Sequence, residues 1–385
     1  MVPADAPSAR RVVVGVVAGG AGPPLLGQSS CDTVPAVTAT RTEVIAEARE
    51  ETISHCPACF ATEVSRVVDV REFMFGTQEE FPYAECGRCG TVRLVDVPPD
   101  LALYYPKAYY SVADDPQHVL GRPPTRQVVA TLGRSAVTGR QVISGVARQV
   151  IRRRQAQTLL SIYAAIARCG VRSRSWRILD VGAGSGLLVY ALSLAGFSAV
   201  HGVDPFAPGD RTFDTGARLE AVGLADCAAG GWDLIMFNHS FEHLLDPEAE
   251  LRLAASRLGA DGRILVRMPT VSSWAWEHFG RDWVQLDAPR HTVIFSRGGM
   301  AALVERCGLQ VLDVTDDSTA FQYWGSGQVR RGVALDDPTS HMVDERRSPF
   351  SRGQIRQWAR AAERLNRQGR GDQAAWVLRP APERQ

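Results

Sequence analysis

In the second half of the chain, apolar segments of strand length alternate with longer segments that favour helix. Trp176–Val181 and Phe197–Val203 are strand-length segments dominated by apolar residues. Leu187–Ala195 lies between them and is apolar and helix-forming, and Gly196 follows it as a helix stop. Strands of a parallel sheet are covered on both faces, so they carry nearly continuous apolar runs of this kind. The pattern predicts a β-α-β unit.

The same alternation continues toward the C-terminus. Asp246 and Pro247 have the form of a helix start, with an N-cap acid followed by proline at the first helical position. The expected strands are Trp232–Phe237, Arg263–Met268, Leu309–Thr315 and Ala374–Leu378, and the expected helices are Asp246–Leu258 and Phe295–Cys307. Strands that alternate with helices indicate an α/β domain with a mostly parallel sheet, here over residues 171–380.

The composition is that of a globular protein with room for two domains, since 45% of the 385 residues are hydrophobic and 22% are charged. No run approaches about 18 consecutive apolar residues, so no transmembrane helix is expected. The net charge of +1 excludes a globally basic nucleic-acid binder. It hides a local imbalance, because residues 116–179 hold 12 Arg and no Asp or Glu. We expect residues 1–50 to be a disordered tail and residues 101–170 to form a Tyr-rich linker and a basic helical cap.

Two CxxC pairs lie in the first quarter of the chain, Cys56 with Cys59 and Cys86 with Cys89. Each pair places two thiolates on one tight turn, and two such turns that face each other form a tetrahedral Cys₄ site suited to Zn²⁺. Because all four ligands come from protein, the expected role of the metal is structural. The segment Val64–Phe75 between the pairs is expected to be a strand, so residues 51–100 are predicted to form a zinc ribbon. The alternative is two pairs of free thiols.

The turn after the first strand of the β-α-β unit is rich in glycine. Asp180 lies in that strand, Gly182, Gly184 and Gly186 follow it, and Asp204 ends the second strand. Glycines in such a turn let a ligand approach the backbone closely, and a carboxylate at the end of the second strand can accept both hydroxyls of a ribose. The spacing is G-x-G-x-G, whereas a dinucleotide turn requires G-x-G-x-x-G. An NAD-type domain and a scaffold without activity are the alternatives.

These residues resemble motif I and the following acidic residue of class I S-adenosylmethionine (SAM)-dependent methyltransferases. The resemblance implies a Rossmann-like α/β fold with a seven-stranded, mostly parallel sheet whose final strand inserts as a hairpin. It also implies SAM as the cofactor. The residues expected to contact SAM are Asp180, Gly182, Gly184, Gly186 and Asp204, together with Asn238 and His239 in the loop after the strand Trp232–Phe237.

Three further segments are similar to one bacterial branch of this family. They are the CPxC…CxxCG module, the aromatic run from Leu103 to Ser111, and the segment Trp283–His291. Enzymes of this branch act on small molecules in natural-product or cell-surface sugar biosynthesis. Deoxysugar C-methyltransferases share the zinc module, a Tyr-rich linker and a Glu-His pair after strand four. The resemblance therefore implies a small biosynthetic acceptor.

The acceptor is expected near the C-terminal ends of the strands, where open α/β sheets bind their ligands. We predict His243 as the general base, Glu242 as the residue that orients it or binds acceptor hydroxyls, and His291 as the reserve candidate. The candidate acceptor contacts are Tyr104, Tyr105, Tyr109, Tyr110 and Arg290. The alternatives are structural: a helix cap for the Glu-His pair, a packed histidine at position 291, and docking anchors for the tyrosines.

We predict that the protein transfers a methyl group from SAM to an O or C atom of a small acceptor. The Arg-rich segment is expected to form a solvated cap helix over the acceptor site, and the alternatives are a role in binding an anionic or carrier-bound acceptor or an anionic membrane surface. Base N-methylation of nucleic acid is not expected, because Asn238–Phe241 lacks the Asn/Asp-Pro-Pro-aromatic run of such enzymes. The alternatives are an RNA methyltransferase that grips RNA with the zinc ribbon and the basic segment, and a catalytically silent scaffold. Paired CxxC units without a clear signal-peptide cleavage site predict a cytoplasmic location.

Overall fold

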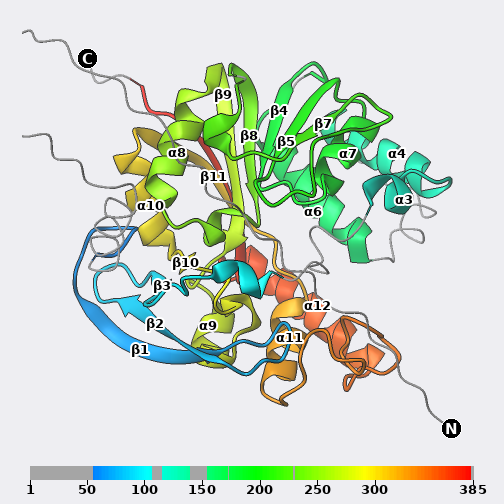
Figure 1. The fold of residues 1–385 in the computed structure, drawn as a ribbon. Helices are drawn as coiled ribbons and strands as arrows, with labels where there is room; N and C mark the ends of the chain where they lie inside the picture. The colour runs from blue at the N-terminus through cyan, green and yellow to red at the C-terminus, as the bar shows by residue number, and fades with distance from the viewer. Residues whose placement is uncertain (1–54, 106–114, 139–153, 172, 229, 383–385) are drawn as a thin grey trace, which may run out of the picture. The chain divides into compact units, whose positions relative to one another are not determined.

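The predicted β-α-β unit is present at the centre of the C-terminal domain (Figure 1). The computed structural model describes residues 55–105, 115–138, 154–171, 173–228 and 230–382. In it, the unit consists of β4 (Arg177–Val181), α7 (Leu187–Leu194) and β5 (Ala199–Val203), and β4 pairs with β5 in parallel. Gly196 follows α7 with a φ of 97°, a left-handed conformation that glycine adopts readily.

The central sheet is mixed and has eight strands in the order β11-β12-β9-β8-β4-β5-β7-β6. The other six strands are β6 (Arg211–Thr212), β7 (Arg218–Glu220), β8 (Trp232–Asn238), β9 (Leu258–Pro269), β11 (Leu309–Asp316) and β12 (Gln373–Pro380). Strands β9, β8, β4, β5 and β7 are parallel, whereas β12 lies antiparallel between β9 and β11. This confirms the expected insertion of the last strand. The sheet exceeds the expected seven strands because the two-residue edge strand β6 pairs antiparallel with β7.

Helices cover both faces of this sheet. Successive side chains of β8 alternate between the faces: Met236 packs with α6 (Arg154–Arg168) and α7, and Ile235 packs with α8 (Pro247–Ser256) and α10 (Arg297–Arg306). Two hydrophobic clusters result, one on each face, which is why the strands are apolar throughout. The expected helix Asp246–Leu258 is shorter than predicted, because α8 ends at Ser256 and β9 already begins at Leu258.

The N-terminal module is a small antiparallel sheet that a strand of the C-terminal domain completes. It contains β1 (Val64–Arg71), β2 (Glu80–Cys86) and β3 (Val92–Leu94), and β10 (Val293–Ile294) pairs with β3. The predicted strand therefore ends at Arg71 rather than Phe75. Because β10 pairs with β3, backbone hydrogen bonds tie the N-terminal module to the C-terminal domain at β10.

The remaining helices surround these two sheets. They are α3 (Pro116–Leu120), α4 (Thr125–Thr138), α9 (Trp274–Phe279), α11 (Phe321–Val329) and α12 (Arg352–Arg367), with short 3₁₀ helices η1 (Leu101–Tyr104), η2 (Leu224–Asp226), η3 (Phe241–His243), η4 (Gly280–Asp282) and η5 (Val284–Leu286). Helices α11 and α12 lie in the long connection from β11 to β12, and the sequence pattern did not predict them. Within the described residues, none of the helices is both long and apolar enough to cross a bilayer. The expected tail 1–50, residues 139–153 of the Arg-rich segment, Tyr109 and Tyr110 lie outside the described residues.

Candidate functional site at the C-terminal ends of the strands

The glycine-rich turn after β4 holds its backbone in conformations that favour glycine. Gly182, Gly184 and Gly186 have φ values of 75°, 57° and 80°. A Cβ atom at position 182 would lie 2.4 Å from the Cβ of Ser240, so this turn also packs tightly against the loop after β8. A side chain at position 182 would therefore displace Ser240, and one at position 186 would lie 2.7 Å from the ring of Phe213.

Two carboxylates accompany the turn. Asp204 accepts hydrogen bonds from the backbone N–H of Gly184 at 2.7 Å and of Phe206 at 2.8 Å, so it connects the turn to the end of β5. Asp180 is 3% exposed, and its Oδ1 atom has no hydrogen-bond partner among the described residues. Burial, followed by the nearby Asp204 carboxylate, raises the pKa of Asp180 to about 8. A buried polar atom without a partner is costly, so this carboxyl group is suited to receive a donor from a ligand.

Asn238 is the last residue of β8 and His239 the first of the loop after it, and the polar atoms of both turn toward Arg267 of β9. The Arg267 guanidinium lies 3.2 Å from Asn238 Oδ1 and 2.6 Å from His239 Nε2, and Asp317 anchors it from the other side. A guanidinium only donates, so His239 Nε2 must accept, and the ring is neutral with its proton on Nδ1. That Nδ1–H faces Glu242 Oε1 at 3.3 Å.

Glu242 and His243 lie in η3, and His291 lies close to both of them. Their ligand-type atoms lie within 4.8 Å of one another, and the imidazole centroids of the two histidines are 4.7 Å apart. Glu242 is fully buried, and its Oε2 atom has no partner among the described residues. Burial works to raise the pKa of Glu242, but the hydrogen bond from His239 and the neighbouring imidazoles outweigh it and lower that pKa to about 2. Glu242 is therefore an anion with one oxygen unengaged.

Both histidines of this cluster donate from Nδ1. His243 Nδ1 is 2.9 Å from the carbonyl oxygen of Arg290, and His291 Nδ1 is 2.7 Å from that of Gln285; carbonyls only accept, so each Nδ1 carries a proton. His291 Nε2 lies 3.8 Å from carboxylate oxygens of both Glu242 and Asp287. Burial, and then the proximity of His291, lowers the pKa of His243 to about 4. A neutral imidazole with a lone pair is able to take a proton.

The residues predicted to contact the acceptor have different neighbours in the structure. The Tyr105 hydroxyl lies 2.9 Å from His243 Nδ1, and its ring stacks on Phe206 at a centroid distance of 6.1 Å. Tyr104 instead donates its hydroxyl to Glu79 of the N-terminal module at 2.7 Å. Arg290 is fully buried and pairs with two carboxylates rather than facing the cluster. The structure thus brings Tyr105, but not Tyr104 or the Arg290 guanidinium, to the histidines.

Four residues of this site were missed by reasoning from sequence. They are Glu72, Ser240, Arg267 and Asp287. Arg267 left a usable signal, since it is a charge inside an otherwise apolar strand and a buried charge needs partners. The others carried none, because their partners lie far away along the chain or in an irregular loop.

The four cysteines of the N-terminal module converge. Cys56 Sγ and Cys89 Sγ are 3.7 Å apart, and Cys59 Sγ and Cys86 Sγ are 3.6 Å apart. Disulfide sulfurs lie about 2.05 Å apart, so these thiols are not paired covalently. Thiolates about 2.3 Å from a tetrahedral ion would lie about 3.8 Å from one another, which matches the observed spacing. The donor set therefore fits a tetrahedral Zn²⁺ ion.

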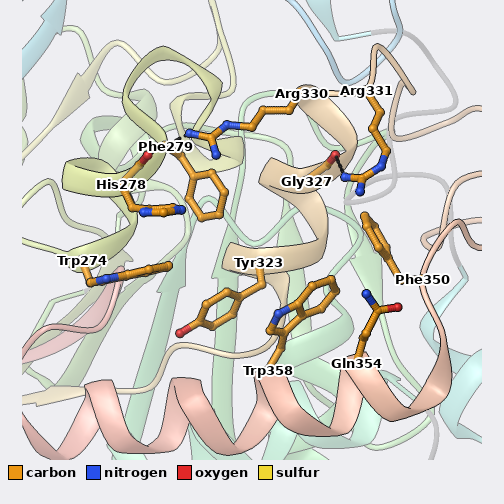
Figure 2. A pocket seen from close by; sticks show the side chains of 10 residues that line it. All are labelled: Trp274, His278, Phe279, Tyr323, Gly327, Arg330, Arg331, Phe350, Gln354 and Trp358. Carbon is orange, nitrogen blue, oxygen red and sulfur yellow. Dashed lines mark hydrogen bonds between the residues drawn. The ribbon is translucent and has the colours of Figure 1, made fainter.

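A separate cavity of about 330 Å³ lies between α9, α11 and α12 (Figure 2). Its walls are largely aromatic, with Trp274, Tyr323 and Trp358 among them, and Arg330 and Arg331 stand at its edge. None of the predicted site residues lines it.

The solved structures that are similar to this chain include several methyltransferases. The sequence matches no curated protein. A putative sarcosine dimethylglycine methyltransferase from Galdieria sulphuraria is 16% identical, with a TM-score of 0.38 over 65% of this chain and 98% of that one. A Haloferax volcanii complex of the Trm112 methyltransferase activator with a putative methyltransferase gives 16% identity and a TM-score of 0.39, with the same coverage. Geranyl diphosphate methyltransferase in complex with SAM gives 13% identity and a TM-score of 0.41 over 64% of this chain and 94% of that one.

One family model matches the sequence itself. It is described as a methyltransferase domain, and it covers residues 150–314. The match includes the glycine-rich turn, both carboxylates beside it and the cluster of Glu242, His243 and His291. Together with the order and direction of the strands, it shows that this chain is an enzyme with a methyltransferase domain of the class I fold.

Proposed function

We propose that the protein uses SAM to methylate an oxygen or carbon atom of a small, hydroxyl-bearing acceptor. The observation that carries this proposal is the neutral His243, whose Nε2 lone pair is kept available beside the ionised Glu242. Both lie in the loop after β8, the strand that pairs with β4 and its glycine turn. A proton acceptor next to a cofactor turn is what transfer to a hydroxyl, or to a carbon beside a carbonyl, requires.

The residues of the turn support SAM as the cofactor. We propose that the backbone of Gly182 and Gly184 approaches its methionine part, that Asp180 receives its amino group, and that Asp204 receives the ribose hydroxyls. The unpartnered Asp180 Oδ1 fits an ammonium group, because a charge-assisted hydrogen bond would compensate its burial. When bound, SAM supplies an activated methyl group on a sulfonium leaving group.

The reaction needs one proton transfer, which we assign to His243. The acceptor O–H or C–H bond would break as its proton passes to His243 Nε2, and the acceptor atom would bond to the methyl carbon as the bond from that carbon to the sulfonium sulfur breaks and leaves its electrons on the sulfur. Glu242 stabilises the imidazolium that results, and its Oε2 atom accepts a hydrogen bond from an acceptor hydroxyl. His291 is the reserve base, and Tyr105 contacts the acceptor beside His243. Because Arg267 and Arg290 are both paired with carboxylates, we propose a neutral rather than an anionic acceptor.

The test combines binding with turnover. Calorimetry should show SAM binding that Asp204→Ala weakens by about 1.5–3 kcal/mol, as for loss of a hydrogen bond to a charged group. Screening hydroxylated small molecules for methyl transfer should then yield a product whose formation His243→Asn slows by about 10²–10⁴-fold while SAM affinity stays unchanged. Absence of SAM binding by the wild-type protein would disprove the proposal.

We also propose that Cys56, Cys59, Cys86 and Cys89 bind one structural Zn²⁺. The tetrahedral spacing of their sulfurs supports this assignment. All four ligand positions come from protein, so the ion would hold the two turns together and would not touch substrate. Metal analysis of purified protein should find one zinc per chain, and a metal-free protein with a folded module would contradict the assignment.

A further inference from the structure

We propose that Glu72, a residue of the N-terminal module, is a positioning residue for His243 and acts on it through Arg290. The module would then be a working part of the transfer site rather than an appended domain. The inference rests on the proposed role of His243 as the general base, but the contacts that carry it do not depend on the identity of the acceptor.

Glu72 follows β1 and is held rigidly. Its side chain is fully buried, and both carboxylate oxygens are engaged. Oε1 accepts from the backbone N–H of Phe75 at 3.0 Å, and Oε2 accepts from the N–H and the hydroxyl of Thr77 at 3.0 and 3.2 Å. The carboxylate therefore has a fixed position within the module.

From this position Glu72 reaches into the methyltransferase domain. Its Oε1 atom accepts from Arg290 Nη2 at 2.9 Å, and both side chains are fully buried. The same guanidinium pairs with Asp287, from Nη2 to Oδ1 at 2.7 Å and from Nε to Oδ2 at 3.1 Å, and Nη1 donates to the carbonyl of Tyr104 at 3.3 Å. Arg290 is thus held from three directions, and two of them come from outside its own loop.

The backbone of Arg290 is the part that touches the proposed base. Its carbonyl oxygen accepts from His243 Nδ1 at 2.9 Å. The hydroxyl of Tyr105 lies at the same distance from the same nitrogen, and it donates its own proton to the Arg290 carbonyl at 3.5 Å while Nδ1 is protonated. If the carbonyl withdrew, the tyrosine would donate to Nδ1, and the imidazole proton would move to Nε2. A histidine in that tautomer presents an N–H rather than a lone pair and cannot act as the base.

The buried Glu72–Arg290 ion pair is better suited to fixing the position of Arg290 than to stabilising the fold. Taking a carboxylate and a guanidinium out of water costs several kcal/mol per ion, and their attraction often only offsets that cost. Two further contacts show that the module holds this loop along its length. Tyr83 donates its hydroxyl to the carbonyl of His291 at 2.8 Å, and the N–H of Leu94 donates to that of Thr292 at 2.9 Å. The module therefore fixes the backbone of the loop that carries the Arg290 carbonyl.

The test is Glu72→Gln, which removes the charge at nearly constant volume and leaves Arg290 paired with Asp287. In protein labelled with ¹⁵N-histidine, two-bond nitrogen–proton correlations report which ring nitrogen carries the proton, and His243→Asn assigns the signal among the eight histidines. We expect the wild-type His243 to be in the Nδ1–H form and Glu72→Gln to populate the Nε2–H form. The matched control is Glu85→Gln, which removes the exposed Arg66–Glu85 pair from the same module and should leave the tautomer unchanged.

Turnover supplies an independent readout once an acceptor is known. Glu72→Gln should lower kcat on the order of 10-fold, as for the loss of an outer-shell partner, with SAM affinity and zinc content unchanged. In the His243→Asn background it should have no further effect, because the two residues act through one path. Should Glu72→Gln fail to fold, Glu72→Asp, which keeps the charge but withdraws it by one methylene, is examined in the same way. An unchanged tautomer in the folded variant overturns the inference. A shifted tautomer in a protein that neither binds SAM nor methylates any acceptor would retain the inference and reject the proposed function.

Discussion

The pKa of His243 makes the site testable without knowledge of the acceptor. Burial and the neighbouring His291 lower it from 6.5 to about 4, so the folded protein keeps this imidazole neutral at pH values where the unfolded chain protonates it. As the pH falls below 6.5, protons therefore favour the unfolded state, and stability is lost until the folded pKa is reached. His243→Asn removes the titrating group while its amide nitrogen can still donate to the Arg290 carbonyl.

The size of this effect follows from the two pKa values. At pH 5, a histidine with a pKa of 6.5 unfolded and about 4 folded destabilises the protein by about 2 kcal/mol relative to neutral pH. Well below pH 4 the loss reaches about 3 kcal/mol. Glu242 contributes little at pH 5, because its ordinary value of 4.5 and its folded pKa of about 2 both lie below that pH.

The assay is urea unfolding, followed by tryptophan fluorescence, at about pH 7.5 and pH 5. The stability lost between these pH values should be about 2 kcal/mol smaller in His243→Asn than in the wild type. All other titrating groups, including the cysteine module, are common to both proteins and cancel in the comparison. His278→Asn, which removes an exposed histidine stacked on Trp274, is the control and should change this loss by less than about 0.5 kcal/mol. An equal loss in wild type and His243→Asn would refute a buried, neutral His243.

Further predictions concern the cofactor turn and the metal. Gly182→Ala should abolish SAM binding in calorimetry, because its Cβ would lie 2.4 Å from that of Ser240 in a backbone with a φ of 75°. The stability that protonated Asp180 contributes is lost as the pH rises from 3.8 through about 8, so Asp180→Asn should flatten the decline seen in urea unfolding of the cofactor-free protein between about pH 6 and pH 9. The same variant should weaken SAM binding in calorimetry, since it removes the carboxylate for the amino group. Cys86→Ala should lose zinc in metal analysis and protease resistance of the module in limited proteolysis.

The sequence predicted the parts of the fold that depend on periodicity. Apolar runs of strand length located β4, β5, β8 and β12, because strands covered on both faces are apolar throughout. They also located β11, an edge strand whose residues are mostly half-buried or exposed. The short strands β6 and β7 were missed, since two or three residues carry no period. Helix α12 was also missed, although Ser351 and Gln354 form a capping box at its start. Its Arg-rich sequence obscured the apolar stripe that faces the core.

The candidate site shows a similar division. Motif spacing identified the glycines, the cysteines and the Glu-His pair, because each of these lies within a few residues of its partners. The roles of Arg267 and Glu72 depend on contacts across 28 and 218 residues of sequence. No local pattern encodes such pairs, and only the fold brings them together. For the same reason the sequence could place Tyr104 and Tyr105 near the site, but it could not predict that Tyr105 contacts His243 while Tyr104 contacts Glu79.

The contacts of the N-terminal module bear on whether it grips nucleic acid or forms part of the transfer site. Its Cys turns dock on α10, where Arg306 donates to the carbonyls of Pro57 and Ala58 and Ser296 donates to that of Cys89. Its sheet ends on β10, and Glu72 reaches Arg290. A grip on RNA would act on binding, so module variants would change the acceptor KM and its salt dependence. If the module instead forms part of the transfer site, its variants would affect the chemical step. Glu72→Gln should then lower kcat, and the KM for the acceptor should change little between low and high salt. A purely salt-dependent KM effect would instead favour the RNA methyltransferase.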